Sequence, residues 1–366
     1  MSRVAILLEQ HWNAVPGGTA SSIVGLIDAL GEIEDVSVIG VHGRHRGAPT
    51  MPINSGLESV QVPFSGRLMT ESWSRLGQPS IDRWLDTDVL HAPAYVMPST
   101  ELAAVVTIHD LAFVRHPEWF TSNGVGFFNR FLERVRRESC EVIVPSNTTA
   151  SDCVDAGIDS SRIHVVPWGI DPVTVTSSDR DRVRSEHGLP ESFALFVGTV
   201  EPRKNLAGLL EAMELVGDLP LVIVGPDGWG DIPTKLTSSA HLRLSGLSRS
   251  DLDAVMSTAD VLVYPSHFEG FGLPVLEAMA VGTPVVTTAG TAAAELMGSS
   301  GLAVDTSSPA LLAEAISQVT NDSNLASALG QEGLERAKAY PWSAAATKTV
   351  AIYDAAITKA AGGKSG

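Results

Sequence analysis

The chain has 366 residues, of which 44% are hydrophobic and 18% are charged, and its formal net charge at pH 7 is −17. This length favours two domains of ordinary size, and the low charged fraction argues against a disordered chain. The acidic balance argues against a protein that binds nucleic-acid backbones, because such a protein needs a broad basic face. Two cysteines, Cys140 and Cys153, build no disulfide framework and favour a reducing compartment.

The lengths of the apolar runs bear on the cellular location. The first of them, Val4–Leu8, is too short for the core of a signal peptide, and none reaches the roughly 18–20 residues of a membrane span. We therefore expect a cytoplasmic protein. A basic helical pattern at 127–137 leaves peripheral membrane association open, since such a face can contact a membrane or an anionic acceptor. A core-facing helix with a solvated basic side fits the same pattern and is the favoured interpretation.

Short runs rich in Val, Ile and Leu recur along the chain and alternate with helical patterns. Unbroken apolar strands are typical of a sheet buried on both faces, and strand–helix alternation predicts parallel, doubly wound sheets. The runs form two series, so we predict two Rossmann-like α/β domains. Strands are expected at Val4–Leu8, Val36–Ile39, Val89–His91, Val105–Ile108, Val142–Val144 and Ile163–Val166, and then at Ala194–Val197, Leu221–Val224, Leu242–Leu244, Val261–Tyr264 and Val285–Thr287.

A polar stretch near residues 168–190 separates the two series. We place the first domain at residues 1–172 and the second at 173–340. Residues 341–366 are expected to form a helix that returns to the first domain, followed by a disordered tail from Gly362. The region from Gly43 to Ser80 is poorly periodic and rich in Gly, Pro and Ser, so it is expected to form long irregular loops.

Polar residues follow several predicted strands, at the sheet edge where parallel α/β proteins bind ligands. Gly17 and Gly18 precede a helical run at Ala20–Leu30 and can offer backbone amides to a phosphate, although Gly-Gly is also common in flexible loops. No G-x-G-x-x-G follows the first strand, so a dinucleotide site lacks its fingerprint. His109 follows Val105–Ile108 and either hydrogen-bonds a substrate while neutral or serves as a structural cap.

The second series contains an adjacent pair of cations after its first strand. Gly198 permits close approach of a ligand, Arg203 can grip a diphosphate bidentately, and Lys204 acts as a point charge. Asn205 is the expected N-cap of a helix that runs to Val216. A solvated Arg-Lys pair is the ordinary alternative, but the position at a strand-to-helix turn favours an anion site.

The most informative stretch is Glu269-Gly-Phe-Gly-Leu-Pro-Val-Leu-Glu277, which follows the strand Val261–Tyr264. It predicts a tight loop and a short helix that begins at Pro274 and stops before Gly282. Free amides of the loop suit phosphate oxygens, and the carboxylate of Glu277 suits a vicinal diol such as ribose. A glycine-rich turn with two surface glutamates is the alternative for this stretch taken alone.

Metal ligation is not supported by the sequence. Many sugar-nucleotide enzymes hold a divalent ion with Asp-x-Asp, but no copy here directly follows a predicted strand, and no His/Cys cluster has metal spacing. We interpret all copies as solvated or capping residues and expect neither a metal nor a cofactor. The three copies are Asp86/Asp88, Asp179/Asp181 and Asp251/Asp253.

Taken together, these motifs resemble the GT-B-fold retaining glycosyltransferases of family 4. The strongest markers are E-G-F-G-L-P-V-L-E-A-M-A from Glu269 and G-T-V-E-P-R-K-N at 198–205. The stretch Ile108–Phe113, with His116-Pro-Glu118 beyond it, resembles a bacterial mannosyltransferase-like subgroup. The resemblance covers nearly the whole chain and is specific for fold and reaction type, but not for the acceptor.

The resemblance implies two Rossmann-like doubly wound domains that face a cleft, the first on the acceptor side and the second binding the nucleotide sugar. It implies a metal-independent hexosyltransferase of polysaccharide biosynthesis. The enzyme would move a sugar, as a first guess mannose from GDP-mannose, to a glycan, glycolipid or small acceptor. Two alternatives stay open: an epimerase or phosphorylase on the same fold, and a non-catalytic nucleotide-sugar-binding protein.

The resemblance also assigns roles to residues. Arg203 and Lys204 would neutralise the donor diphosphate, Glu269 would contact hydroxyls of the transferred sugar, Glu277 would bind the ribose, and His109 would contact the sugar from the first domain. No enzyme nucleophile is evident. The further substrate-binding residues implied are Gly17, Gly18, Gly198, Gly246, Leu247, Gly270, Phe271, Gly272 and Leu273.

Overall fold

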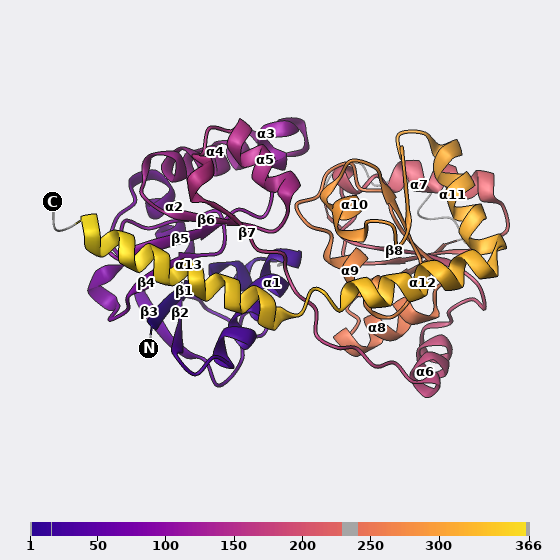
Figure 1. Cartoon of the computed structure of the whole chain (residues 1–366), viewed down its shortest axis with the longest axis horizontal. Coiled ribbons are helices and arrows are strands. Elements are labelled where there is room, and N and C mark those ends of the chain that lie inside the picture. Colours follow the sequence, from indigo (N-terminus) through magenta and orange to yellow (C-terminus); the bar gives the residue numbers. More distant parts are fainter. Residues whose placement is uncertain (1, 16, 229–240, 364–366) are drawn as a thin grey trace. The chain divides into compact units, whose positions relative to one another are not determined.

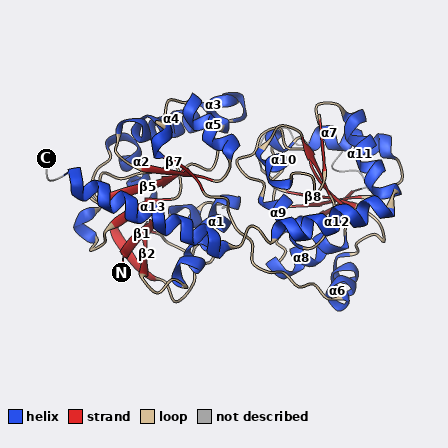
Figure 2. Cartoon of the chain, viewed as in Figure 1, coloured by secondary structure: helices blue, strands red, loops and turns tan. Residues whose placement is uncertain are grey.

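The computed structural model describes residues 2–15, 17–228 and 241–363 (Figure 1). The chain divides into two compact units, each with its own parallel sheet (Figure 2). Unit 1 comprises Met1–Gly169 and Trp342–Gly366, and unit 2 comprises Ile170–Pro341. The first division thus follows Gly169, where the sequence suggested residue 172, and the second follows Pro341, where it suggested residue 340. The expectation of a disordered tail from Gly362 is wrong for Gly362 and Gly363, which are the last residues of a helix, and residues 364–366 lie outside the described residues.

Unit 1 contains a seven-stranded sheet in the order β3-β2-β1-β4-β5-β6-β7, in which every neighbouring pair is parallel. This confirms the predicted doubly wound α/β class. The central strands are buried on both faces, which explains their uninterrupted apolar sequences. The strands are β1 (Ser2–Leu7), β2 (Val36–Arg44), β3 (Glu58–Ser65), β4 (Val89–Ala92), β5 (Ala103–Thr107), β6 (Glu141–Val144) and β7 (Ile163–Val165).

Helices cover both faces of this sheet. On one face α1 and α13 pack on β1, β4 and β5 through residues such as Ile23, Ile27 and Tyr353. On the other face α2, α4 and α5 bury Trp73 and Phe131 among others. The helices are α1 (Gly17–Gly31), α2 (Gly66–Leu76), α3 (Ala112–Arg115), α4 (Ser122–Arg137), α5 (Asn147–Asp155) and α13 (Trp342–Gly363).

The C-terminal helix α13 is fixed to the sheet of unit 1 by a buried hydrogen-bond chain. Tyr353 on α13 bonds Nδ1 of His91 at 2.7 Å, and Nε2 of the same ring bonds the hydroxyl of Thr107 at 2.8 Å. Burial lowers the pKa of His91 to about 3, so the ring is neutral and can satisfy both partners. A helix that starts beyond unit 2 in the sequence is therefore an integral layer of unit 1.

Unit 2 contains a six-stranded parallel sheet in the order β10-β9-β8-β11-β12-β13. Helices α7 and α11 pack together on one face of the sheet. The strands are β8 (Ala194–Val197), β9 (Leu221–Val224), β10 (His241–Leu244), β11 (Val261–Tyr264), β12 (Val285–Thr288) and β13 (Leu302–Val304). The helices are α6 (Ser177–His187), α7 (Leu206–Val216), α8 (Arg249–Thr258), α9 (Leu273–Ala280), α10 (Ala292–Met297), α11 (Pro309–Asn321) and α12 (Ser323–Ala337).

The interpretation of residues 43–80 as irregular loops is wrong for residues 43–44, which end β2, and for residues 58–76, which form β3 and α2. Strand β3 lies at the edge of its sheet and exposes most of its side chains, so its sequence has no continuous apolar run. Strand β13 was missed for a related reason, since it is a three-residue strand at the edge of the other sheet.

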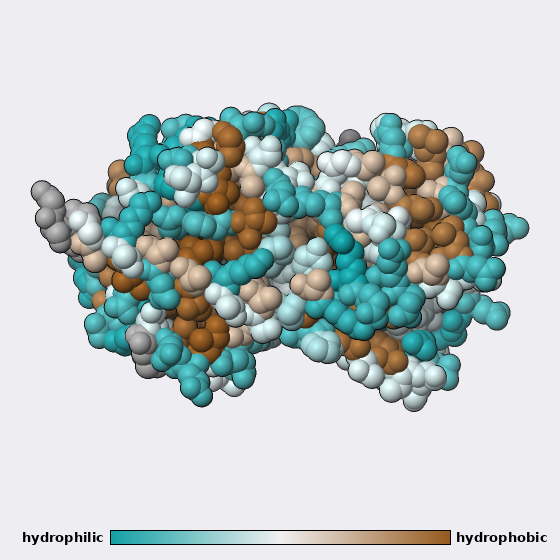
Figure 3. All heavy atoms as spheres, viewed as in Figure 1, coloured by the Kyte–Doolittle hydropathy of each residue, from teal (hydrophilic) through white to brown (hydrophobic). Residues whose placement is uncertain are grey.

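The basic pattern at 127–137 lies on α4, whose apolar side is buried through Phe131, Leu132 and Val135. Much of its basic side is engaged within unit 1, where Arg134 donates to the carbonyls of Trp73 and Met97. The structure therefore favours the core-facing interpretation. Within the described ranges no helix has the length and apolarity that a membrane crossing requires. On the face seen in Figure 3, hydrophobic side chains form separate patches among polar ones.

Candidate active site

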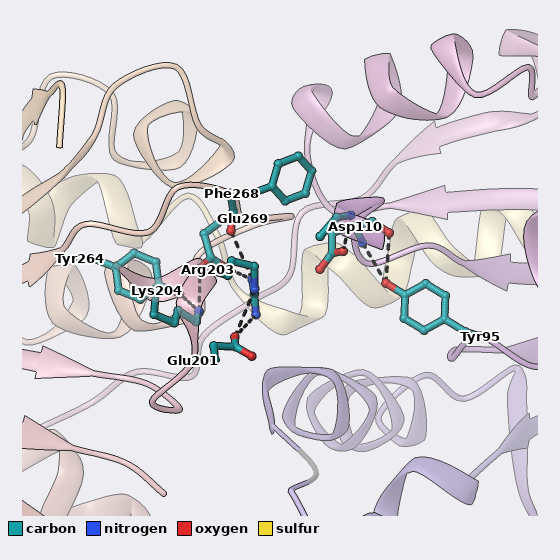
Figure 4. Close-up of polar contacts among 9 residues, drawn as sticks. Tyr95, Asp110, Glu201, Arg203, Lys204, Tyr264, Phe268 and Glu269 are labelled. Atoms are coloured by element: carbon teal, nitrogen blue, oxygen red, sulfur yellow. Dashed lines mark hydrogen bonds and ion pairs between the residues drawn. The ribbon is translucent and has the colours of Figure 1, made fainter. Parts of the chain in front are cut away.

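The buried ammonium of Lys204 is the centre of a charged cluster in unit 2. It donates to Oε1 of Glu269 at 2.6 Å and to the hydroxyl of Tyr264 at 2.7 Å (Figure 4). The side chains of Lys204 and Glu269 are only 9% and 8% exposed. They meet because β8 and β11 are neighbours in the sheet, so that the segments after their carboxyl ends lie together.

Arg203 lies between two carboxylates in the same cluster. Its guanidinium donates to Glu201 at 2.7 and 3.1 Å, to Glu269 at 3.2 Å and to the carbonyl of Phe268 at 3.2 Å (Figure 4). Its side chain is 21% exposed, whereas that of Glu201 is 3% exposed. Protein acceptors thus orient the guanidinium of Arg203 while part of the side chain remains accessible to solvent. An anion-binding arginine requires both conditions.

The charges of the cluster shift one another's pKa values. Burial lowers the pKa of Lys204, and the neighbouring Glu269 opposes that shift. Burial alone would raise the pKa of Glu269, but Lys204 and Arg203 together lower it to about 2. Two cations therefore face two carboxylates, Glu201 and Glu269. A ligand anion that contacts Arg203 would meet an oriented cation in surroundings where little water competes, which strengthens the interaction.

The loop after β11 has the predicted form of tight turn and short helix. Helix α9 begins at Leu273, one residue before the predicted start, so Pro274 lies in its first turn, and Gly282 follows its end. Gly272 caps the helix with φ at 106°, and a Cβ there would lie 3.0 Å from that of Ala293. A glycine is required at this position for both reasons.

Glu277 lies on α9 and is paired with Arg249 of α8. Arg249 also pairs with Asp253 at 2.7 Å, and its side chain is 51% exposed. The pKa of Glu277 is raised, chiefly by burial, and the nearby Arg249 limits that rise. An ionised carboxylate is the better acceptor for two ribose hydroxyls. Gly246 and Leu247, which were expected near the base, lie in the turn just before α8.

The predicted residues of unit 1 follow their strands as expected. His109 comes after β5, is 4% exposed, and bonds the carbonyl of Pro93 through Nε2 at 2.5 Å. Burial lowers the pKa of the imidazole, so the ring is neutral, Nε2 carries the proton and Nδ1 is an acceptor. His109 and Trp168 line a cavity of unit 1. Gly17 and Gly18 form the first turn of α1.

Tyr95 fixes the turn that carries His109. Its hydroxyl donates to the carbonyl of Asp110 at 3.0 Å, and Oδ1 of Asp110 accepts from the amide of Ala112 at 2.9 Å (Figure 4). Sequence reasoning did not single out Tyr95, Glu201, Tyr264 or Arg249. Of these four, only Glu201 could have been suspected from the sequence, because it lies two residues before the predicted site residue Arg203.

The Asp-x-Asp copies serve other purposes. Asp86 pairs with Arg3, and Asp88 accepts from the amide of Arg3 at 2.8 Å. Asp179 forms a capping box with Thr176 at the start of α6. The last copy pairs with arginines, Asp251 with Arg182 and Asp253 with Arg249. Across residues 2–15, 17–228 and 241–363, no group of three or more His, Cys, Asp or Glu side chains is placed to hold a metal ion.

Known proteins match both units. Residues 16–174 match the sequence model of Glycosyltransferase Family 4, and residues 177–336 match that of Glycosyl transferases group 1. O-antigen chain mannosyltransferase B of Escherichia coli is 28% identical over 78% of this chain and 80% of its own length. The MMP alpha-(1->4)-mannosyltransferase of Mycolicibacterium hassiacum is 30% identical over 64% of this chain and 58% of its own. A D-inositol 3-phosphate glycosyltransferase of Salinispora arenicola is 32% identical over 69% of this chain and 63% of its own.

Solved structures resemble the whole fold. Sucrose-phosphate synthase from Thermosynechococcus elongatus aligns with a TM-score of 0.77 at 19% identity, over 98% of this chain and 100% of that one. WaaG, a glycosyltransferase involved in lipopolysaccharide biosynthesis, aligns with a TM-score of 0.73 at 20% identity, over 96% and 99% of the two chains. With both sequence models matched and this fold shared, the chain belongs to the GT-B-fold glycosyltransferases of family 4 and is a transferase enzyme.

Proposed function

We propose that this enzyme transfers a hexose from a nucleoside diphosphate sugar to a hydroxyl-bearing acceptor, with retention of configuration and without a metal ion. The observation that carries the proposal is the cluster in which Lys204 and Arg203 converge on Glu269 at the carboxyl edge of the unit 2 sheet. Such oriented cations suit the task of stabilising a departing nucleoside diphosphate.

In this proposal, different residues of unit 2 bind different parts of the donor. Arg203, which is partly exposed, binds the diphosphate bidentately, and the buried Lys204 adds positive charge behind it. Glu269 accepts hydrogen bonds from hydroxyls of the transferred sugar, and Glu277 accepts those of the ribose. The amides at the start of α9 would donate to oxygens of the phosphate and the sugar.

Metal independence follows from the same charges. In many sugar transferases a divalent ion neutralises the leaving diphosphate, whereas here two protein cations would do so. Attack by the acceptor on the face that the diphosphate leaves would preserve the configuration through an ion pair, and it requires no enzyme nucleophile.

Relatives support mannose as the first donor sugar to test. Two similar proteins are named mannosyltransferases, one of them acting on an O-antigen chain, and another is named for inositol 3-phosphate. A structural neighbour was solved with UDP and glucose, so uridine nucleotides belong in the same screen as GDP-mannose. A glycan, a glycolipid or a small polyol is the corresponding acceptor class.

A ligand screen with product analysis tests this function. Nucleotides and nucleotide sugars should raise the melting temperature of the wild-type protein but not that of Arg203→Ala. Release of a nucleoside diphosphate from the stabilising sugar donor would support transfer. Formation of an epimerised nucleotide sugar, or binding without turnover in the presence of a varied acceptor pool, would instead support one of the alternatives.

A further inference from the structure

Basic side chains gather at one edge of unit 1, although the whole chain carries a net charge of −17. His42 and Arg44 lie at the end of β2, His45 and Arg46 follow it, and Arg67 lies in the first turn of α2. We call these five residues the basic edge. Arg44, Arg46 and Arg67 are all exposed, and none of the three forms an ion pair or hydrogen bond with another described residue.

The fold brings the two segments of the basic edge together. Strands β2 and β3 are parallel neighbours, and Arg44 lies opposite Ser65 after an irregularity in the register. Ser65 is the N-cap of α2, so Arg67 follows it by two residues. A Cβ on Gly43 would lie 2.5 Å from the Cα of Gly66, so the two backbones are in direct contact here.

Neighbouring side chains order this edge. Trp12 stacks on His45 with ring centroids 4.2 Å apart and an interplanar angle of 8°. Glu9 accepts from the amide of Gly43 at 2.5 Å and pairs with His45 at 3.3 Å. This nearby carboxylate is therefore engaged with the amide and the imidazole, and not with the arginines. Glu71, one turn after Arg67 on α2, is paired with Arg75.

The position and chemistry of the basic edge suit a phosphate. The carboxyl ends of parallel strands are where α/β proteins bind ligands, and β2 and β3 both end here. Guanidinium groups match phosphate oxygens bidentately. The first turn of α2 contains no acidic residue that would oppose an anion.

We propose that the basic edge binds a phosphate group carried by the acceptor substrate. The proposal rests on the proposed function in one respect, that the enzyme transfers a sugar to an acceptor, which the family resemblance assigns to the first domain. The group that the basic edge recognises is a phosphate ester, and this ester could belong to a soluble sugar phosphate or to a lipid headgroup.

The test uses the full-length protein labelled with 5-fluorotryptophan. The fluorine signal of Trp12, assigned with Trp12→Phe, reports locally on the stacked ring beside the arginines. Glucose 6-phosphate, its uncharged counterpart glucose, and vesicles of phosphatidylglycerol or phosphatidylcholine are the probes. The test variant is Arg44→Gln/Arg46→Gln/Arg67→Gln. The control Arg3→Gln/Arg75→Gln/Arg137→Gln removes the same charge from three other arginines of unit 1, each of which has a carboxylate partner.

Glucose 6-phosphate should shift the Trp12 signal, and its affinity should fall at least tenfold in the test variant and less than twofold in the control. Binding to the wild type should weaken with added salt. A shift with phosphatidylglycerol vesicles alone would identify a lipid-borne phosphate and also support the proposal. No shift with either phosphate probe, an equal shift with glucose, or equal losses in both variants would overturn it. Calorimetric titration with GDP separates the two proposals, because GDP affinity depends on unit 2 and should be unchanged in the test variant.

Discussion

Replacing Lys204 by methionine should destabilise unit 2 as well as weaken donor binding. The ammonium lies 2.6 Å from Glu269, and both side chains are more than nine-tenths buried. Removing one partner of such a pair leaves an uncompensated buried charge and typically costs about 3–5 kcal/mol. Because Glu269 keeps Arg203 at 3.2 Å, we expect the lower end, about 3 kcal/mol of the free energy of unfolding in urea.

The double variant Lys204→Met/Glu269→Leu separates stability from function. It removes both charges and keeps apolar volume, so it should regain most of the lost free energy of unfolding. Neither variant should bind a nucleoside diphosphate with wild-type affinity, because the cation behind the diphosphate is absent in both. Unchanged unfolding and unchanged nucleotide affinity in Lys204→Met would refute the reasoning.

The acid limb of the stability curve provides a further check on the same pair. The folded pKa of Glu269 is about 2, below its ordinary value of 4.5. A carboxyl with a depressed pKa contributes stability that is present above about 4.5 and is lost as the pH falls toward 2. In Lys204→Met the folded pKa of Glu269 should be higher, since burial then acts with less opposition, so the acid-dependent loss of stability that Glu269 causes should be smaller than in the wild type.

Three further outcomes follow from the charged contacts. Arg249→Gln should weaken GDP binding most at acidic pH, because without Arg249 the buried Glu277 protonates at higher pH. Titrations of GDP affinity from pH 5 to 8 test this, and the same pH dependence of affinity in variant and wild type would contradict it. Glu201→Gln should lower turnover by about tenfold, since the buried carboxylate orients the Arg203 fork, whereas tighter GDP binding with normal turnover would mean that Glu201 competes with the ligand. Excess EDTA should leave turnover unchanged, and a loss that Mn²⁺ restores would contradict metal independence.

Buried strands could be predicted from the sequence because burial on both faces of a sheet requires an unbroken run of apolar residues. Strands β8, β9 and β11 have the predicted bounds, and each is fully buried. Strand β3 lacks this signal because it lies at the edge of its sheet and most of its side chains are exposed, which is why it was missed.

For the candidate active site, the sequence predicted where residues lie along the chain but not which of them contact one another. Periodicity predicts that Lys204 and Glu269 each follow a strand, but it does not order the strands within a sheet. The family resemblance gave both residues a role at the donor but did not predict their contact, which the adjacency of β8 and β11 explains. The pairing of Arg249 with Glu277 depends on how α8 and α9 pack, so no local pattern indicated it.

The most direct test of the central claim is proton NMR of the enzyme mixed with α-configured nucleotide sugars, GDP-mannose first, in the presence of EDTA. Water can replace the acceptor, so the acceptor need not be known. The account predicts release of the nucleoside diphosphate and a first-formed sugar of α configuration, with both signals lost in Arg203→Ala. A first-formed β sugar, cleavage that requires an added metal ion, or unimpaired cleavage by Arg203→Ala would contradict it.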